Sequence, residues 1–334
     1  MFDWKNYVLD ARFGREDPVP WSVIANKLVQ MNVWPELTWE QVKQKARDFC
    51  RQRPEYTGKR LNAPKPKVEK PKPVKVTQNY EPSETGDEGW KPGQTVRFAV
   101  VSDTHINSKY TQLTYLHDFY EECRKRGIKH VYNCGDISDG ENMRVGHNYE
   151  LYKIAADEQV DEICRVYPRV EGITTHFITG NHDASAMKHC GYDIGPAIAL
   201  RRPDMKYLGK DIAIVHLTPN CTMELLHPWD GGSYALSYRP QKIVEALDGG
   251  TKPNLLFIGH YHKALFMEYR NVATFLAGCF QGTTPFMRGK GLSRHMGGWI
   301  VEIDTDLNGY ITRITPTFIP YYVDIDEDYK HFAE

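Results

Sequence analysis

Several segments of the sequence place Asp, Asn or His side chains directly after a run of apolar residues. VVSDTHIN, NCGDISDG, THFITGNHD and IGHYH supply Asp103, His105, Asp136, Asn181, His182, His260 and His262. Such groups are costly to bury without partners. Imidazole nitrogens mixed with carboxylate and amide oxygens suit first-row divalent metals such as Mn, Fe, Zn or Ni. The pattern therefore predicts a metal centre, with Asn181 as a ligand and His182 beside it facing substrate.

The elements that position these groups are strands alternating with helices after residue 96. RFAVVSD, HVYNCGD and THFITGNHD are typical of buried strands, whereas TQLTYLHDFYEECRKRG and NYELYKIAADEQVDEICRVY are typical of helices. This β-α-β alternation predicts an α/β domain with parallel strands, whose carboxyl ends share one edge. The D-x-H and H-x-H spacings place two side chains on the same side of an extended segment.

The later part of the chain predicts a second, mainly antiparallel sheet. DIAIVHL and CTMELLH are expected to form a hairpin, followed by a helix at YRPQKIVEAL, a strand at NLLFIGH and several late strands. His216 and His227 compete for one remaining ligand position. CTMELLH, the helix and NLLFIGH form a β-α-β unit whose strands end at the same edge. We therefore expect His227, rather than His216, to join His260.

The ordered set of motifs resembles the calcineurin-like metallophosphoesterase superfamily over roughly residues 96 to 320. The motifs are Asp103-x-His105, Gly135-Asp136-x-x-Asp139, Gly180-Asn181-His182-Asp183, a lone His227 and Gly259-His260-x-His262. The resemblance implies two sheets flanked by helices, with two divalent metals at the strand ends, Mn being the expected metal. It implies one metal held by Asp103, His105, Asp136 and His262, and a second held by Asp136, Asn181, His227 and His260.

The same resemblance implies hydrolysis of a phosphate ester by a metal-activated water. His182 would stabilise or protonate the leaving oxygen, and Asp139 or Asp183 would orient its ring. Protein phosphatases of the superfamily usually continue the second motif as D-R-G and end the third in Glu. Asp139-Gly140 and Asp183 depart from both patterns, which favours phosphodiesterases, including repair nucleases of the SbcCD type. Phage-encoded phosphoesterases also resemble the overall architecture.

Basic residues outside the motifs are candidates for contacts with a substrate phosphate. They lie just after the second motif and in MRGKGLSRH, and they are Arg144, His147, Arg288, Lys290 and Arg294. DNA is the expected partner. A homodimer and a partner ATPase are further expectations, drawn from the resemblance to repair nucleases.

The net charge of −1 conceals a division of the chain. Residues 1 to 80 contain 16 Lys+Arg and 9 Asp+Glu, a balance of +7, which leaves −8 for the rest. Residues 1 to 58 predict a small all-α, helix-turn-helix-like domain, and residues 59 to 95 a linker that is first Pro/Lys-rich and then acidic. Residues 96 to 334 predict the metallophosphoesterase domain. The candidate nucleic-acid contacts on the second helix are Lys43, Lys45, Arg47, Arg51 and Arg53.

Three functions compete on this evidence. The leading hypothesis is a DNA-directed phosphodiesterase with a basic module that tethers DNA. The alternative is a phosphatase or cyclic-nucleotide phosphodiesterase on small substrates, with a regulatory helical module whose basic face is solvated. A non-catalytic binding protein is disfavoured because every ligand position is filled. Seven scattered cysteines without a C-x-x-C pair, no secretory signal pattern and no run of 18 apolar residues predict a cytoplasmic protein without a membrane partner.

Overall fold

The computed structural model describes residues 2–14, 19–53, 90–250 and 252–332. The chain divides into two compact units, Met1–Asn79 and Tyr80–Glu334, which are described separately. Most of the predicted linker, residues 59 to 89, lies outside the described residues. Among the described helices, none is long and apolar enough to cross a membrane.

The first unit contains α1 (Trp4–Phe13), α2 (Trp21–Gln30) and α3 (Trp39–Arg51), which share a small apolar core. Asp3 caps α1 by accepting a hydrogen bond from the backbone N–H of Asn6, a signal that the sequence interpretation missed. The predicted capping box of Thr38 and Gln41 opens α3. Eight residues, 31 to 38, separate α2 from α3. Since a helix-turn-helix uses about three or four, the unit is a three-helix cluster with a longer connection.

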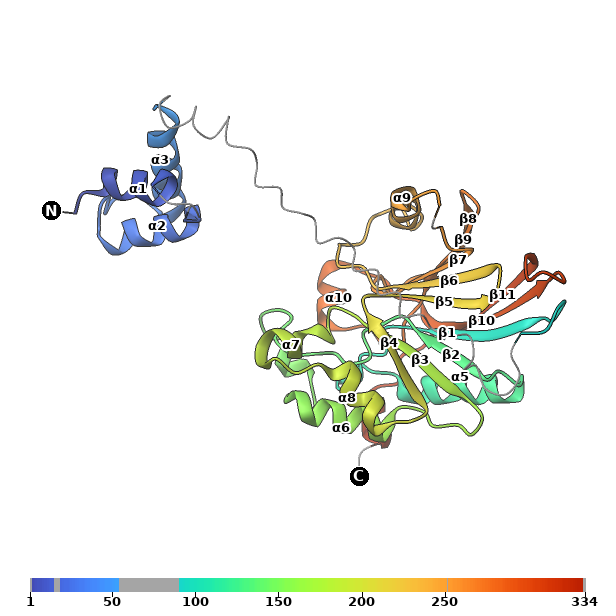
Figure 1. The fold of residues 1–334 in the computed structure, drawn as a ribbon. Coiled ribbons are helices and arrows are strands. Elements are labelled where there is room, and N and C mark those ends of the chain that lie inside the picture. The colour runs from blue at the N-terminus through green and yellow to red at the C-terminus, as the bar shows by residue number, and fades with distance from the viewer. Residues whose placement is uncertain (1, 15–18, 54–89, 251, 333–334) are drawn as a thin grey trace. The chain divides into compact units, whose positions relative to one another are not determined.

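The second unit contains two β-sheets, shown in Figure 1. The first has the order β11-β10-β1-β2-β3-β4 and the second the order β5-β6-β7-β9-β8. The strands of the first sheet are β1 (Val96–Val101), β2 (His130–Asn133), β3 (Thr174–Thr179), β4 (Met205–Lys210), β10 (Met296–Thr305) and β11 (Ile311–Tyr321). Those of the second are β5 (Ile212–Thr218), β6 (Cys221–Leu226), β7 (Leu255–Ile258), β8 (Ala264–Tyr269) and β9 (Val272–Ala277).

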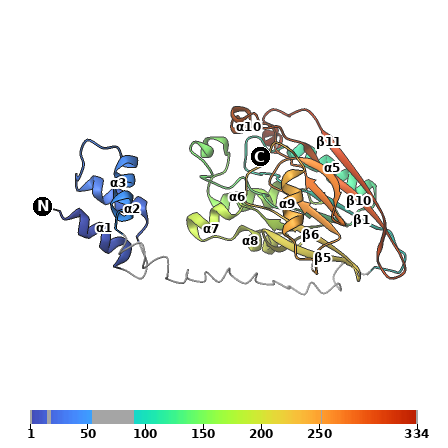
Figure 2. The same cartoon turned by 90° about the horizontal axis from the view of Figure 1, so that it is seen from above.

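Helices cover the outer face of each sheet, so the unit has an α-β-β-α layering. The helical segments are α5 (Leu113–Lys125), η2 (His147–Glu150), α6 (Ala156–Val166), α7 (Ala184–Cys190), α8 (Ile194–Arg201), α9 (Tyr238–Ala246), α10 (Pro285–Lys290) and η3 (Asp328–Phe332). Core residues of α5, α6 and α8 pack against the first sheet. Figure 2 shows α9 lying over strands of the second sheet, where Val244 packs on Leu256 and Ile258.

Strand β1 shows how the sequence produces these layers. Its side chains alternate between two faces of the sheet. Ala99 and Val101 point into the core below the helices, whereas Phe98 and Val100 point into the core between the sheets. A run of apolar residues without polar alternation is what a strand needs when both of its faces are buried.

Two sequence expectations differ from the structure. The late hairpin β10-β11 joins the first sheet, antiparallel to β1, and the second sheet is mixed because β7 pairs in parallel with both β6 and β9. The helix expected over NYELYKIAADEQVDEICRVY is interrupted between η2 and α6. There, the backbone N–H of Tyr152 donates to the carbonyl oxygen of Asn107, 2.9 Å away, so tertiary contacts replace helical hydrogen bonds.

The parallel pairs decide where the functional side chains lie. Strands β1, β2 and β3 run in parallel in the first sheet, as do β6 and β7 in the second. The segments that follow their carboxyl ends contain all of the predicted metal-ligating residues, which the two stacked sheets therefore bring to one edge of the unit.

Candidate metal centre

The predicted ligand residues sit in sharp backbone turns. Five of them have a positive φ, between 44° and 75°: Asp103, His105, Asp136, His260 and His262. Left-handed conformations are uncommon for residues with a Cβ and cluster at functional sites. Such turns re-aim each side chain from the strand axis toward the shared edge.

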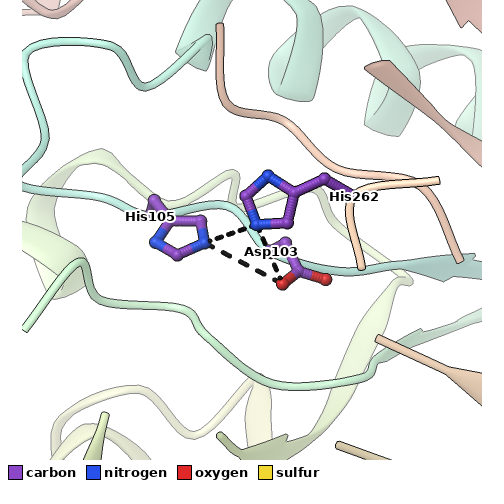
Figure 3. Close-up of side chains that lie close together, drawn as sticks. All are labelled: Asp103, His105 and His262. Carbon is purple, nitrogen blue, oxygen red and sulfur yellow. Dashed lines mark hydrogen bonds and ion pairs between the residues drawn. The ribbon is translucent and has the colours of Figure 1, made fainter. Parts of the chain in front are cut away.

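The first group of side chains consists of Asp103, His105 and His262, drawn in Figure 3. The Nε2 atoms of the two rings lie 3.0 Å apart. Asp103 Oδ1 lies 3.3 Å from Nε2 of His262 and 3.8 Å from Nε2 of His105. Three donor atoms therefore face one small volume.

The second group consists of Asp136, His227 and His260, with Asn181 beside them. His227 Nε2 lies 3.1 Å from Asp136 Oδ2 and 3.1 Å from Asn181 Oδ1. The same Asp136 oxygen lies 3.9 Å from His105 Nε2 of the first group. One carboxylate oxygen thus faces both groups. His216, the competing candidate, is exposed on β5.

Hydrogen bonds on the far side of the rings fix their orientation. His105 Nδ1 lies 2.7 Å from Asp139 Oδ1, and His227 Nδ1 lies 2.7 Å from the carbonyl oxygen of Cys134. His260 Nε2 lies 2.7 Å from the carbonyl oxygen of Asp230. Since metal-binding imidazoles usually donate their other N–H to such an acceptor, these contacts leave the opposite ring nitrogens for a cation.

The buried carboxylates of the site favour positive charge close to them. Burial raises the pKa of Asp103, Asp136 and Asp139, but nearby histidines offset this, so each pKa ends below its ordinary value. Burial alone would lower the pKa of His105 and His227; the carboxylates outweigh it and raise these pKa values to about 10 and about 9. In the protein alone, protons on the histidines balance the carboxylates, and a divalent cation would take over that role.

The donor set fits divalent metals. In each group, one donor atom per Asp or His lies within 4.8 Å of the others, a spread that an ion can close. His262 Nδ1 is buried, and it has no hydrogen-bond partner within the described part of the chain. Buried polar atoms normally have partners. The other ring nitrogen of His262, Nε2, is the one that faces Asp103 and His105. Imidazole, carboxylate and amide ligands match Mn, Fe, Zn or Ni.

His182, the predicted catalytic residue, lies at the rim of the first group. Its side chain is 18% exposed, and its ring centroid lies 4.6 Å from that of His105. Its Nδ1 lies 2.6 Å from the carbonyl oxygen of Asp139, so the Nδ1–H donates to that oxygen. Its Nε2 is therefore the ring nitrogen left for substrate.

Asp139 and Asp183 occupy different positions. The carboxylate of Asp139 is shared by histidine rings, at 2.7 Å from His105, 3.2 Å from His147 and 3.4 Å from His182. The carboxylate of Asp183 accepts hydrogen bonds from the backbone N–H groups of Ile137, Ser138 and Gly180 at 2.8 to 3.2 Å. Asp139 is thus placed to orient His182, whereas Asp183 fastens the second and third motifs together.

The residues that were predicted to contact a substrate phosphate differ in exposure and in whether they already pair with a carboxylate. His147 is 1% exposed and lies behind Asp139, so the structure does not place it at a substrate surface. Arg144 pairs with Glu150 at 2.6 Å, and Arg294 pairs with Asp324. Arg288 and Lys290 are exposed on α10. Gln281, which the sequence interpretation missed, donates to Asp139 Oδ1 at 3.3 Å; an amide after a buried strand was its only signal.

In the first unit, the predicted nucleic-acid contacts lie on and just after α3. Three of the cationic groups lie over aromatic rings: Lys43 over Trp39 at 4.4 Å, Lys45 over Trp34 at 4.8 Å, and Arg53 over Phe49 at 4.1 Å from the ring centroids. Arg47 lies 5.8 Å from the centroid of Trp21, and Arg51 pairs with Asp48 at 3.5 Å. These interactions are compatible with a phosphate-binding face and with a purely structural one.

One protein-family model matches the chain. The model of the calcineurin-like phosphoesterase superfamily domain matches residues 96–289. No curated protein matches the chain.

Solved structures that match the chain include three proteins with low sequence identity to it. An archaeal phosphodiesterase is 14% identical, with a TM-score of 0.39, over 67% of this chain and 100% of that protein. Vps29 from Entamoeba histolytica, complexed with zinc, is 14% identical, with a TM-score of 0.35, over 67% of this chain and 99% of Vps29. A putative 5′-nucleotidase from Staphylococcus aureus is 13% identical, with a TM-score of 0.38, over 72% of this chain and 57% of that one.

Proposed function

The chain belongs to the calcineurin-like phosphoesterase superfamily and is a metal-dependent phosphoesterase, and from this premise we propose that it is a dinuclear phosphodiesterase that hydrolyses DNA. The observation that carries the dinuclear centre is the position of Asp136. Its Oδ2 lies 3.1 Å from Nε2 of His227 and 3.9 Å from Nε2 of His105, between the two groups of donors.

We assign two ions to these groups. Asp103, His105, Asp136 and His262 would hold one, and Asp136, Asn181, His227 and His260 the other, with manganese the expected ion. Bound divalent ions would supply Lewis acidity toward a phosphoryl oxygen and lower the pKa of water. The protein's own contribution is to fix the donor atoms through the hydrogen bonds behind the rings.

His182 is proposed to handle the proton at the leaving group. Its Nδ1–H is engaged by the Asp139 carbonyl oxygen at 2.6 Å, so the proton given to the leaving oxygen would come from Nε2. The Asp139 carboxylate, 3.4 Å from His182 Nδ1, favours the charged ring that carries this proton. Asp139 is a positioning residue in this scheme.

Two features support a phosphodiester substrate and a nucleic acid. The third motif ends in Asp183, whose carboxylate is used by backbone N–H groups, in place of the Glu usual in protein phosphatases. The first unit carries cationic side chains along α3, and Lys45 and Arg51 are exposed there. Cationic side chains on a helix bind nucleic acid through its phosphates.

A phosphatase or cyclic-nucleotide phosphodiesterase is the second candidate. The observation that favours it is the stacking of Lys43, Lys45 and Arg53 on aromatic rings of their own unit. If these cations serve packing, the first unit would act in regulation rather than in tethering DNA.

The test is metal-dependent hydrolysis by chelator-stripped protein re-supplied with manganese. The substrates are labelled single- and double-stranded DNA, bis(p-nitrophenyl) phosphate and p-nitrophenyl phosphate. We expect DNA cleavage that disappears in Asp136→Asn. A Lys45→Gln/Arg51→Gln variant should raise KM for DNA, reduce its salt dependence and leave the small diester unaffected. Turnover of the small esters with intact DNA would refute the nuclease and favour the second candidate.

A further inference from the structure

A basic aromatic cluster, composed of Trp229, Lys188 and Lys210, lies next to the metal centre. Each member lies in or next to a segment that carries a proposed ligand. Trp229 is two residues after His227, and Lys210 ends β4, where it pairs with Thr179, two residues before Asn181. Lys188 belongs to α7, which begins directly after the third motif.

The segment that carries Trp229 is held by residues around the centre. The half-buried Asp211 lies close to the indole, which offsets part of the rise that burial causes in the pKa of this carboxyl group. The backbone carbonyl of Asp211 accepts from the N–H of His227 at 2.7 Å, and the next residue after the tryptophan, Asp230, accepts from His260 at 2.7 Å. The backbone on both sides of Trp229 is therefore held by contacts that involve His227 and His260 of the second metal group.

The surroundings of the ring are basic and open. Trp229 is 54% exposed. The ammonium groups of Lys188 and Lys210 lie 5.0 Å and 4.9 Å from its ring centroid. Both lysines are exposed, and neither forms an ion pair with a carboxylate in the ranges that the structure describes. An exposed indole with two ammonium groups over it combines an apolar face with positive charge, of which the nearby Asp211 offsets a part.

We propose that Trp229 stacks on a base next to the scissile phosphodiester and that Lys188 and Lys210 bind backbone phosphates of that strand. This inference rests on the proposed nuclease function and deepens it, because it names an unstacked, single-stranded nucleotide as the group bound beside the centre. Every base has a face that an aromatic ring can stack on, and positive side chains follow the backbone. Lysine ammonium groups suit phosphate as point charges.

Lys188 and Lys210 also have a simpler role than binding phosphate, and the experiment must distinguish the two roles. A cation over an indole ring is itself favourable, so Lys188 and Lys210 would serve only to cover the tryptophan if no base stacked there. In that case, Trp229 would have no influence on whether a substrate carries a base.

The experiment compares two single-stranded oligonucleotides cleaved by the manganese-loaded full chain. They differ only in a base or an abasic sugar beside the labelled scissile position. The measured quantity is the ratio of kcat/KM for the two substrates. For the wild type we expect about tenfold or more in favour of the base, the low end of what aromatic stacking supplies. Trp229→Ala should bring the ratio near one, and Trp229→Phe should retain most of it.

The lysines form an independent arm of the test. Lys188→Gln/Lys210→Gln should raise KM for both oligonucleotides alike and reduce the slope of log KM against log salt by about one per lysine. The arm does not depend on Trp229→Ala folding correctly. An unchanged base ratio in Trp229→Ala, with wild-type cleavage intact, would overturn the inference alone. A wild-type protein that hydrolyses small esters but neither oligonucleotide would instead refute the nuclease function beneath it.

Discussion

A histidine pair on the neighbouring strands β2 and β3, outside the proposed ligand set, gives the sharpest stability prediction. His176 in β3 is 1% exposed, and its Nε2 lies 3.1 Å from Nδ1 of His130 in β2. Its ring stacks on Tyr132 at 5.0 Å between centroids. Burial lowers the pKa of His176 from 6.5 to about 3, helped by the charges of His130 and of Lys206 in β4.

The sign and size of the effect follow from proton linkage. The unfolded chain binds a proton at His176 below pH 6.5, but the native state resists protonation until about pH 3. Stability is therefore present above pH 6.5 and is lost as the pH falls. With these two pKa values, the loss between pH 7 and pH 5 is about 2 kcal/mol, and the limit well below pH 3 is about 5 kcal/mol.

The assay is urea unfolding of the wild type and His176→Phe at pH 7, 6 and 5, in the presence of a chelator. Phenylalanine keeps a ring on Tyr132 but cannot titrate. Contributions from the histidines of the metal centre are common to both proteins and cancel in the difference. We expect the variant to gain about 2 kcal/mol relative to the wild type between pH 7 and pH 5. A difference that does not change with pH would refute the buried neutral histidine.

Four further predictions concern the centre and the core. Asp136→Asn should lose both bound metal and hydrolysis, as measured by metal analysis and turnover, because one oxygen serves both groups; a variant that retained two ions would contradict this bridging role. His182→Ala should keep its metal content and lose rate by about a hundredfold or more, and full activity would exclude a catalytic role. Arg202 is 1% exposed, pairs with Asp204 and donates to three backbone carbonyl oxygens. Arg202→Met should therefore lower the free energy of unfolding, measured by urea titration, by about 3 to 5 kcal/mol. A loss of less than about 1 kcal/mol would count against this role of Arg202. Burial raises the pKa of Glu224 to about 7, so stability falls as the pH rises from 4.5 through 7; Glu224→Gln should raise Tm at pH 8 more than at pH 5, and equal shifts at both would contradict the assignment.

The two-sheet fold was predictable because polar groups end apolar runs in a fixed order along the chain. Once β1, β2 and β3 are recognised as parallel, Asp103, Asp136 and Asn181 must share an edge. The choice of His227 over His216 followed from the same topology, since β6 and β7 are parallel whereas β5 runs the opposite way.

The remaining features depend on contacts that no local pattern encodes. The apolar run of β10 indicates a buried strand, but nothing in it specifies pairing with β1 rather than with the second sheet. Trp229 and Lys210 meet only because β4 and β6 lead into adjacent turns. The acceptors behind His227 and His260 are backbone carbonyl oxygens, which every residue offers.

The glycines that open three of the motifs explain how a lone histidine is placed without a motif of its own. A Cβ on Gly135 would lie 2.7 Å from His227 Nδ1, and one on Gly259 would lie 2.9 Å from the same atom. A Cβ on Gly180 would lie 2.6 Å from His227 Nε2. Contacts this short require the ring to move, so all three turns need glycine for the imidazole to fit between them. The three glycines thus leave room for the His227 ring. Alanine at Gly135 would press first on that ring, whereas alanine at Gly180 or Gly259 would press first on Asp136 Oδ1 or on Ser102 Oγ.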